Sequence, residues 1–571
     1  MFTNIKSYVV PNLILLALTL INNPVNAASN EPIQLNSFVN VERFRIDPNN
    51  EYVVFNEFDF NNILNRFTRR IDGSSGSIQI DNDVSTTSQG TQFWIDNTNS
   101  RILSRTTNLS NGNREFLSVS INGDSSTLLA PSPPSTGDVS SISTSGDTIE
   151  IAFITRLGGR LFSVPNDGSE QSIDLSSSID PGSNVDVGRI RQTPDGNSVV
   201  FDAELNDIRQ EALFVVPIDG SNTATQLTPL NSSSVNNFSI SSDLTQVIYI
   251  EEVGLEGEPN FQQQLFSVAL DGNNDPIPLT GLITGEFNNI DFKISPNSQQ
   301  VVYTTTNETL NQTQLFSVPV DGSSNPILVD DSIEIYQFEI TNNNEKIIYS
   351  LEEPLQPQFP NTPTLPVIFS SSLVPTTSEE PLLLSASNTN SFFFFLSIDI
   401  DINFVVSQNS DFVFYVQELI LGSGNSLNRV SINNPSDFLM LNLPPTFNNT
   451  QSLSVSESVL GFELSNDGTF IIYNYAPVFE AQNIEDFPPN IDTLQRSLLS
   501  KVSIDGSNNQ PLNTNGENVF EFDISNNDEF VVFTAGLEDI FTNLYSLNLE
   551  EVEPLCFPIK DKNDNFVTVC L

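Results

Sequence analysis

Oxygen-bearing side chains alternate with apolar ones along Ser397–Phe404, which reads SIDIDINF. In a β-strand, Asp399 and Asp401 would lie on one face with the Ser397 hydroxyl and the Asn403 amide, because successive side chains point to opposite faces. Calcium is bound by such oxygens. The stretch therefore predicts a candidate calcium site at Asp399 and Asp401. The alternative interpretation is an ordinary strand with one polar face.

The residue types argue against the common catalytic sites. The chain contains no histidine, which is the commonest general base and the commonest metal ligand. No Gly-x-Ser-x-Gly nucleophile motif occurs, because Gly73-Ser74-Ser75-Gly76 has the wrong spacing. Zinc, copper and iron would find almost no ligands, so we predict no cofactor, with calcium as the candidate ion. Paired carboxylates could hydrolyse glycosides, although no single pair stands out among the 71 acidic residues.

The two cysteines, Cys556 and Cys570, are both close to the C-terminus. In an oxidising compartment they could close a loop of about 15 residues, which would stabilise the fold by roughly 3 kcal/mol. We predict a disulfide that ties down a terminal hairpin, and the alternative is two free buried thiols.

The N-terminus has the form of a secretory signal. Lys6 precedes the apolar run Leu13–Ile21, and Val25-Asn26-Ala27 places small residues where a signal peptidase requires them. No later stretch approaches the roughly 20 apolar residues of a spanning helix. We therefore predict an exported protein, periplasmic or extracellular, that loses residues 1–27.

Acidic residues dominate the charge. Lys and Arg number 21 against 71 Asp and Glu, which gives a net charge of −50. A field of this sign repels nucleic acid and anionic lipid, so we expect neither as a partner. A protein or a cell-envelope polymer is the partner that we predict.

A two-part sequence pattern recurs along the chain about every 50–60 residues. Its first part is a short apolar strand, a polar turn and a second strand, as in FKISPNSQQVVY. Aligned on the last residue before the turn, ten segments match. They are anchored at Ile46, Ile95, Ile142, Arg191, Ile240, Ile294, Ile340, Val406, Leu464 and Ile524.

The second part is an aromatic–aliphatic strand followed by an Asp-Gly or Asn-Gly turn. Glycine supplies the positive φ that such tight hairpin turns require, and Asp or Asn caps the turn locally. The turns are at Asp72-Gly73, Asn122-Gly123, Asp167-Gly168, Asp219-Gly220, Asp271-Gly272, Asp321-Gly322 and Asp505-Gly506.

These patterns predict an all-β chain, because no stretch has a sustained helical period. Strands grouped in fours at this period indicate a β-propeller of about ten four-stranded blades. A single large ring and two tandem rings both fit. We expect a candidate ring-closing strand within 28–37, repeats 1–7 within 38–350, repeats 7–10 within 351–558, and a C-terminal strand within 559–571. Repeats 7–10 contain two Pro-rich insertions, Glu353–Pro366 and Ala476–Leu494, which we predict to be loops inside blades.

The motif Phe-x-Ile-Ser-Pro-(Asp/Asn), then Val-Val-Tyr, then Leu-Phe-Ser-Val-Pro-x-Asp-Gly-Ser resembles the blade repeat of TolB-type and tricorn-type propellers. It is also similar to the propeller domain of the dipeptidyl peptidase and prolyl oligopeptidase family. The resemblance covers about residues 38–558. It implies a WD40-like propeller fold and carries over none of the peptidase's catalytic residues.

Three functions are consistent with these observations. The first is an exported, non-enzymatic propeller that binds a protein or an envelope polymer through one face. The second is a carboxylate-based or calcium-dependent hydrolase or lyase that works in the channel. The third is a structural surface or matrix protein.

Overall fold

The fold is that of a computed structural model. The structure describes residues 31–36, 40–59, 64–84, 93–96, 101–107, 114–129, 139–143, 150–155, 159–179, 185–205, 211–229, 234–253, 261–284, 290–307, 312–331, 335–354, 364–376, 380–385, 404–418, 425–442, 453–481, 497–512, 518–536, 542–549, 556–560 and 566–570.

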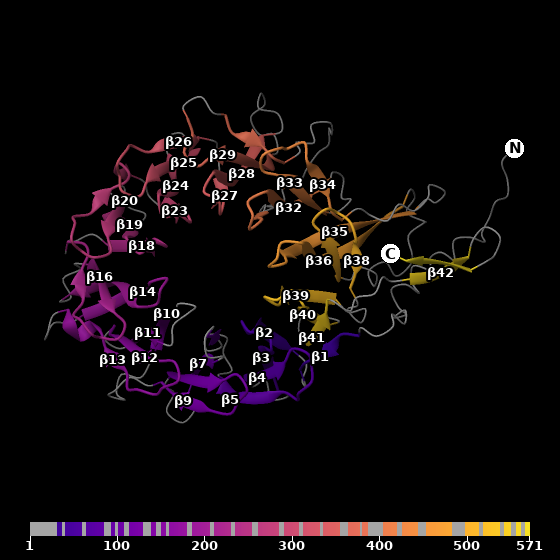
Figure 1. The fold of residues 1–571 in the computed structure, drawn as a ribbon, viewed down its shortest axis with the longest axis horizontal. Helices are drawn as coiled ribbons and strands as arrows, with labels where there is room; N and C mark the ends of the chain where they lie inside the picture. Colours follow the sequence, from indigo (N-terminus) through magenta and orange to yellow (C-terminus); the bar gives the residue numbers. More distant parts are fainter. Residues whose placement is uncertain are drawn as a thin grey trace.

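The described residues form ten antiparallel sheets that follow one another around a single ring (Figure 1). We number these sheets as blades 1–10. In each blade the first strand lies innermost and the fourth outermost, so that each chain segment runs outward from the channel.

Blade 1 consists of β2 (Val41–Ile46), β3 (Tyr52–Phe58), β4 (Leu64–Arg70) and β5 (Ile78–Val84), and blade 2 of β6 (Phe93–Ile95), β7 (Arg101–Thr107), β8 (Arg114–Ser120) and β9 (Ser126–Leu128). Blade 3 consists of β10 (Val139–Ser143), β11 (Glu150–Thr155), β12 (Leu161–Pro165) and β13 (Ile173–Asp174), and blade 4 of β14 (Val185–Gln192), β15 (Ser198–Leu205), β16 (Glu211–Pro217) and β17 (Thr225–Gln226). Blade 5 consists of β18 (Ser234–Ile240), β19 (Gln246–Val253), β20 (Gln262–Ala269) and β21 (Ile277–Pro278). β22 (Ile283–Thr284) also pairs with β20, and a 3-10 turn, η3 (Ser176–Ser178), follows β13.

Blade 6 consists of β23 (Ile290–Ile294), β24 (Gln300–Asn307), β25 (Gln312–Pro319) and β26 (Ile327–Asp330), and blade 7 of β27 (Ile335–Ile340), β28 (Lys346–Pro354), β29 (Thr364–Ser372) and β30 (Leu382–Leu383). Blade 8 consists of β31 (Phe404–Val406), β32 (Phe412–Glu418), β33 (Asn425–Ser431) and β34 (Phe438–Met440), and blade 9 of β35 (Leu453–Leu464), β36 (Phe470–Ala481), β37 (Leu498–Ser503) and β38 (Gln510–Pro511). Blade 10 consists of β39 (Asn518–Ile524), β40 (Phe530–Gly536), β41 (Thr542–Asn548) and β1 (Ile33–Gln34). β42 (Cys556–Lys560) and β43 (Phe566–Cys570) form a separate two-stranded sheet.

The hydrophobic core is divided among the interfaces between consecutive blades, which we call seams. The described residues form ten buried apolar clusters, and each combines residues of two neighbouring blades. One blade alone would leave both faces of its sheet in water, so stacking the blades is what buries them. The cluster that joins Phe44 and Phe55 of blade 1 to Val532 and Leu544 of blade 10 covers the seam between the last blade and the first.

The N-terminal strand takes part in this last seam. β1 pairs antiparallel with β41, with Ile33 opposite Ser546 and Gln34 opposite Tyr545. Blade 10 is therefore built from both ends of the repeat array, which ties the ring at the point where the chain would otherwise be open.

Stacked aromatic side chains link the second and third strands within six blades. Each pair is also a register pair, so the aromatic at the end of the Val-Val-Tyr motif packs on the Phe or Tyr of the next strand. The pairs are Phe55–Phe67, Phe201–Phe214, Tyr249–Phe266, Tyr303–Phe316, Tyr349–Phe369 and Phe533–Tyr545.

Two repeats align differently from their sequence anchors. The strand register places Ile142 opposite Phe153, in the way that Phe44 lies opposite Phe55, so the anchor of the third repeat is shifted by two residues. In the fourth repeat Gln192, not Arg191, precedes the turn. The alignment sought each anchor at the last apolar residue before the turn, and in these two segments the residue at that place is polar.

The two predicted Pro-rich insertions, Glu353–Pro366 and Ala476–Leu494, are strand at their described ends. β28 continues to Pro354 and pairs there with Thr364 of β29. β36 continues to Ala481 and pairs there with Leu453 of β35. Hairpin pairing satisfies the backbone groups of these ends, which composition alone had assigned to loop.

The Asp-Gly and Asn-Gly turns have the predicted conformation. All seven glycines have φ between 62° and 78°. In each turn the Asp or Asn side chain accepts a hydrogen bond from the backbone N–H two residues later, as Asp321 does from Ser323 at 3.0 Å. The prediction of positive φ at these glycines, with local capping by the preceding residue, is confirmed.

The glycines of these turns also allow consecutive blades to pack closely. The turn that ends the third strand of one blade packs on the fourth strand of the preceding blade. A Cβ built on Gly322 would lie 2.7 Å from Cγ2 of Ile277, and one on Gly73 would lie 2.5 Å from Cγ2 of Ile33. The absence of a side chain is therefore needed for stacking as well as for the turn.

We expect Gly322→Ala to lower the free energy of unfolding by more than Gly468→Ala does. Both glycines have positive φ, which costs alanine about 1–2 kcal/mol, but a Cβ on Gly468 would meet nothing within 4 Å. Overpacking against Ile277 should add about 1–3 kcal/mol for Gly322→Ala alone. Urea unfolding of the two variants measures the difference, and equal losses would show that the contact with Ile277 is unimportant.

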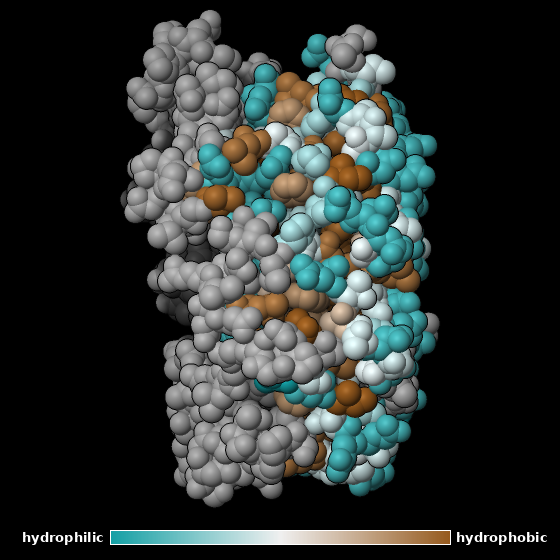
Figure 2. Space-filling view, turned by 90° about the vertical axis from the view of Figure 1, so that its left-hand side faces the viewer, coloured by the Kyte–Doolittle hydropathy of each residue, from teal (hydrophilic) through white to brown (hydrophobic). Residues whose placement is uncertain are grey.

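The outer wall of the ring carries single apolar side chains. Apart from β5, each outermost strand has only two to four residues, and exposed residues such as Ile78, Ile173, Ile277 and Leu382 lie on the outermost strands. Figure 2 shows hydrophobic side chains interspersed with hydrophilic ones over the described part of this wall. Short edge strands limit pairing with other chains.

Candidate functional site

The inner strands present one side chain per blade to the next blade. This residue lies between the apolar residues of the Phe-x-Ile motif, and we call its place the seam position. Lys293 of β23 forms an ion pair with Glu339 of β27 and lies 5.6 Å from the centre of the Phe338 ring. Arg191 of β14 similarly lies 5.8 Å from the centre of the Phe238 ring of β18. At these two seams the cation thus rests on the aromatic ring of the following blade.

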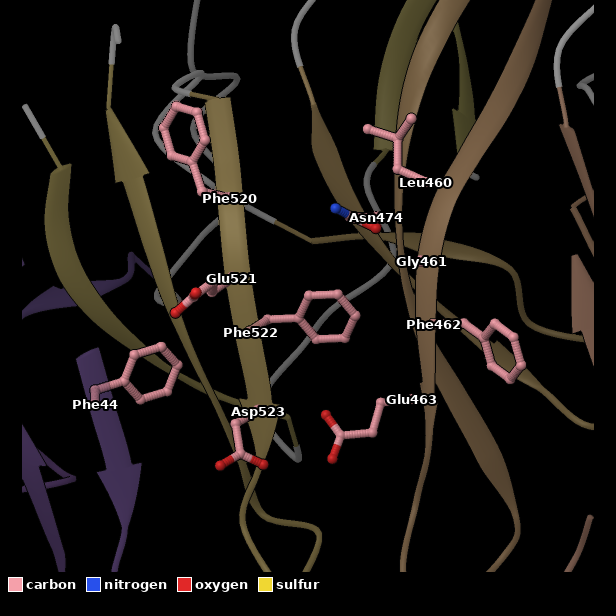
Figure 3. Close-up of a pocket in the computed structure, with 10 residues that line it drawn as sticks. All are labelled: Phe44, Leu460, Gly461, Phe462, Glu463, Asn474, Phe520, Glu521, Phe522 and Asp523. Carbon is pink, nitrogen blue, oxygen red and sulfur yellow. The ribbon is translucent and has the colours of Figure 1, made fainter. Parts of the chain in front are cut away.

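The seam between blades 9 and 10 departs from this arrangement. Its seam positions hold Glu463 of β35 and Asp523 of β39, and the two carboxyl groups are within hydrogen-bonding distance of each other. Figure 3 shows Glu463 extending from β35 toward Asp523, with Phe522 between the two strands. Two acids therefore meet where another seam joins a lysine to an acid.

The two carboxyl groups hold a proton more tightly than isolated acids do. Burial raises the pKa of Glu463 to about 8, assisted by the negative charge of Asp523 and by the hydrogen bond to it. Burial also raises the pKa of Asp523, although the hydrogen bond from Glu463 and the charge of Arg45 act in the opposite direction. Because like charges this close disfavour joint ionisation, we assign the shared proton to Glu463, with Asp523 as its acceptor.

A cavity of about 580 Å³ opens beside this pair. Four phenylalanines and a leucine form its apolar wall, and they come from the innermost strands β2, β35 and β39 (Figure 3). Its lining residues are Phe44, Leu460, Gly461, Phe462, Glu463, Asn474, Phe520, Glu521, Phe522 and Asp523.

A β-bulge shapes one wall of the cavity. The pairing of β35 with β36 skips Leu460, between Val459 and Gly461, so Leu460 is an extra residue in the inner strand. Its side chain is 56% exposed. Tyr336 of β27 occupies the matching bulge in blade 7 and is 48% exposed, so the bulge recurs while its side chain varies.

Asn474 of β36 brings an unsatisfied acceptor to the cavity. Only 8% of its side chain is exposed, and its Oδ1 atom is buried without a hydrogen-bond partner. A Cβ on the facing Gly461 would lie 3.2 Å from this oxygen, so glycine leaves it uncovered. Buried amide oxygens almost always have a partner, which indicates a place for a hydrogen-bond donor that the described residues do not supply.

The same position is satisfied within the protein in three other blades. Asn56 accepts from Nε of Arg66 at 2.9 Å, Asp202 from the backbone N–H of Arg189 at 2.8 Å, and Thr534 from the backbone N–H of Glu521 at 3.2 Å. Asn474 therefore differs from these three counterparts, and resembles Ser350 of blade 7, whose buried hydroxyl also has no partner among the described residues.

The residues predicted from sequence do not lie in this cavity. Asp399 and Asp401 are outside the described residues, and no group of three or more metal-ligating side chains occurs among those described. Cys556 and Cys570 are Cα partners in the β42–β43 register. Directly paired antiparallel residues have Cα atoms about 4.5–5.5 Å apart, within the range that a disulfide spans, so the disulfide stays a prediction compatible with the backbone.

Sequence reasoning missed Glu463 and Asp523 because it found no acidic pair that stood out. The signal was present in the motifs, since FEL and FDI are the ninth and tenth repeats and both carry an acid at the seam position. Using it required knowing that consecutive blades meet at that position.

The comparisons with known proteins concern the fold. No protein-family model and no curated protein matches the chain. Among solved structures, the Dos1 propeller matches with a TM-score of 0.38 at 12% identity, over 71% of this chain and 96% of that chain. The tricorn protease matches with 0.30 at 10%, over 90% and 58%, and a prolyl endopeptidase with 0.33 at 11%, over 68% and 54%. The chain is an all-β propeller.

In the part of the chain that the structure describes, no helix is both long and apolar enough to span a bilayer.

Proposed function

We propose that this exported propeller is a non-catalytic binding protein that holds a segment of a partner protein in the cavity between blades 9 and 10. The observation that carries the proposal is the phenylalanine-lined cavity with the unpartnered Oδ1 of Asn474 at its wall. Binding sites typically combine an apolar wall with a few polar groups that fix the orientation of the ligand.

The lining favours a protein segment over an envelope glycan. Phe44, Phe462, Phe520 and Phe522 offer rings without polar atoms, which suit apolar side chains. A glycan would place many of its hydroxyl groups against these rings, where they find no hydrogen-bond partner, and only Glu463, Glu521, Asp523 and Asn474 could accept from the others.

Catalysis by the Glu463–Asp523 pair is the second candidate, since a protonated and an ionised carboxyl side by side are the usual acid and base. Glycoside hydrolysis, however, needs carboxyl groups about 5–9.5 Å apart to admit the substrate. Two groups within hydrogen-bonding distance of each other leave no such space. This geometry argues against glycoside hydrolysis.

Leu460→Asp tests the proposed function. Random dodecapeptides displayed on phage are selected on the immobilised full chain, and the enriched peptides are titrated against each variant. We expect affinity to fall at least about tenfold, because a carboxylate in the apolar wall would have to be desolvated when a ligand covers it.

Tyr336→Asp is the matched control, because it places the same charge in the equivalent bulge of blade 7. It should leave peptide binding unchanged. A selection without specific binders, or an equal loss in both variants, would contradict a binding site at this cavity.

A further inference from the structure

The cation that the 9/10 seam lacks can be deduced from the other seams. At the 6/7 seam, Lys293 lies against Phe338 and Glu339. The residues in the corresponding places at the 9/10 seam are Glu463, Phe522 and Asp523, as the register of the inner strands shows. Glutamate therefore stands where lysine stands in blade 6, and the ring and the acid of the following blade are retained.

In the part of the chain that the structure describes, one cation acts on the pair, and it comes from blade 1. Arg45 of β2 in blade 1 acts on Asp523 and lowers its pKa. Glu463 instead feels the negative charges of Asp523 and Asp528. Among the described residues, no cation rests on Phe522 as Lys293 rests on Phe338.

We propose that the cavity binds a lysine or arginine side chain of the partner protein, with its cationic group over the Phe522 ring and beside the paired carboxyl groups of Glu463 and Asp523. This inference rests on the proposed function, since it names the group that the same cavity recognises. The aliphatic part of such a side chain would contact the phenylalanine wall, as lysine and arginine stems commonly do.

Asn474 provides an independent observation for the same ligand. Its Oδ1 is an acceptor without a donor, and it lines the cavity together with the two carboxyl groups. A basic residue in an extended segment has donors at both ends, the cationic group and its backbone N–H. A chain with a net charge of −50 also attracts basic segments over a distance.

A metal ion fits the site less well. Calcium takes six to eight oxygen ligands, and although Glu463, Glu521 and Asp523 line the cavity, no three acidic side chains among the described residues are grouped closely enough to hold a metal ion. The ring of Phe522 would lie where several of those oxygens are needed, whereas it suits an ammonium or guanidinium group.

The test uses peptides selected on the full chain as above, and replaces their basic residue by norleucine. We expect the enriched peptides to share a lysine or arginine flanked by apolar residues. Norleucine should weaken binding by about tenfold to a hundredfold, as expected for a charge-assisted contact. Above about pH 8, where Glu463 is ionised, Glu463→Gln should weaken the basic peptide by a similar factor and leave the norleucine peptide unchanged.

Glu339→Gln is the matched control, since it removes an acid from the seam position of blade 7. It should bind the basic peptide like the unaltered chain. Enriched peptides without a basic residue, or an equal effect of Glu463→Gln on both peptides, would overturn the inference and leave the proposed function intact. Displacement of the peptide by calcium chloride, with thermal stabilisation that Glu463→Gln abolishes, would overturn it in favour of a metal site. Failure to select any peptide would remove the proposed function and the inference together.

Discussion

Replacing Leu35 by alanine should lower the free energy of unfolding by about 2–5 kcal/mol, the range for a large core side chain that leaves a cavity. Leu35 directly follows β1 and is fully buried in the cluster that joins blades 10 and 1. Its backbone N–H donates to the carbonyl of Leu544 at 2.7 Å, and Asn36 Oδ1 accepts from the N–H of Leu544 at 3.0 Å. Loss of this packing weakens the strand by which the last blade is tied to the start of the chain.

Leu382→Ala is the control with the same chemistry. Leu382 lies on β30, the outermost strand of blade 7, and is 41% exposed, so we expect a loss below about 1 kcal/mol. Urea unfolding followed by the fluorescence of Trp94, the single tryptophan, reports on blades close to the closure. Similar midpoints for the two variants would show that β1 adds little to the stability of the ring.

Glu463→Gln should stabilise the protein at alkaline pH. The pKa of Glu463 is raised from 4.5 to about 8, so the folded chain binds a proton that the unfolded chain releases between these values. The free energy of unfolding therefore falls as pH rises through this window, by up to about 5 kcal/mol for a shift of this size. Glutamine does not titrate, so the variant should gain stability over the unaltered chain from about pH 5 to about pH 8.

The groups that face Glu463 determine this sign. Asp523 and Asp528 oppose its ionisation, and the backbone N–H of Ile524 favours it. Arg45 acts on Asp523 and is unchanged in the variant. Thermal unfolding at pH 5 and at pH 8.5 measures the effect, with Glu339→Gln as the comparison, because loss of the partner of Lys293 should lower stability instead. If the variant is no more stable than the unaltered chain at pH 8.5, ionisation of Glu463 does not destabilise the folded protein.

The amino-acid sequence by itself determined the strands and turns. The anchors at Ile46, Ile294 and Ile524 each end an innermost strand, and the glycines of the Asp-Gly turns have the expected positive φ. These features depend on neighbours within a few residues, namely the alternation of apolar side chains and the conformational freedom of glycine. The all-β class and the number of blades follow from them.

Only the tertiary structure decided how the blades meet. Every seam is built from similar apolar residues, so the local pattern leaves one ring and two rings equally acceptable, and the pairing of β1 with β41 is a contact between chain ends. Glu463 and Asp523 are about 60 residues apart in the sequence. Their raised pKa values arise from burial at a seam, and the missing partner of Asn474 is recognised by comparison with Asn56 and Thr534 in space. Desolvation, like-charge repulsion and hydrogen-bond satisfaction are properties of the assembled seam, and no single segment contains them.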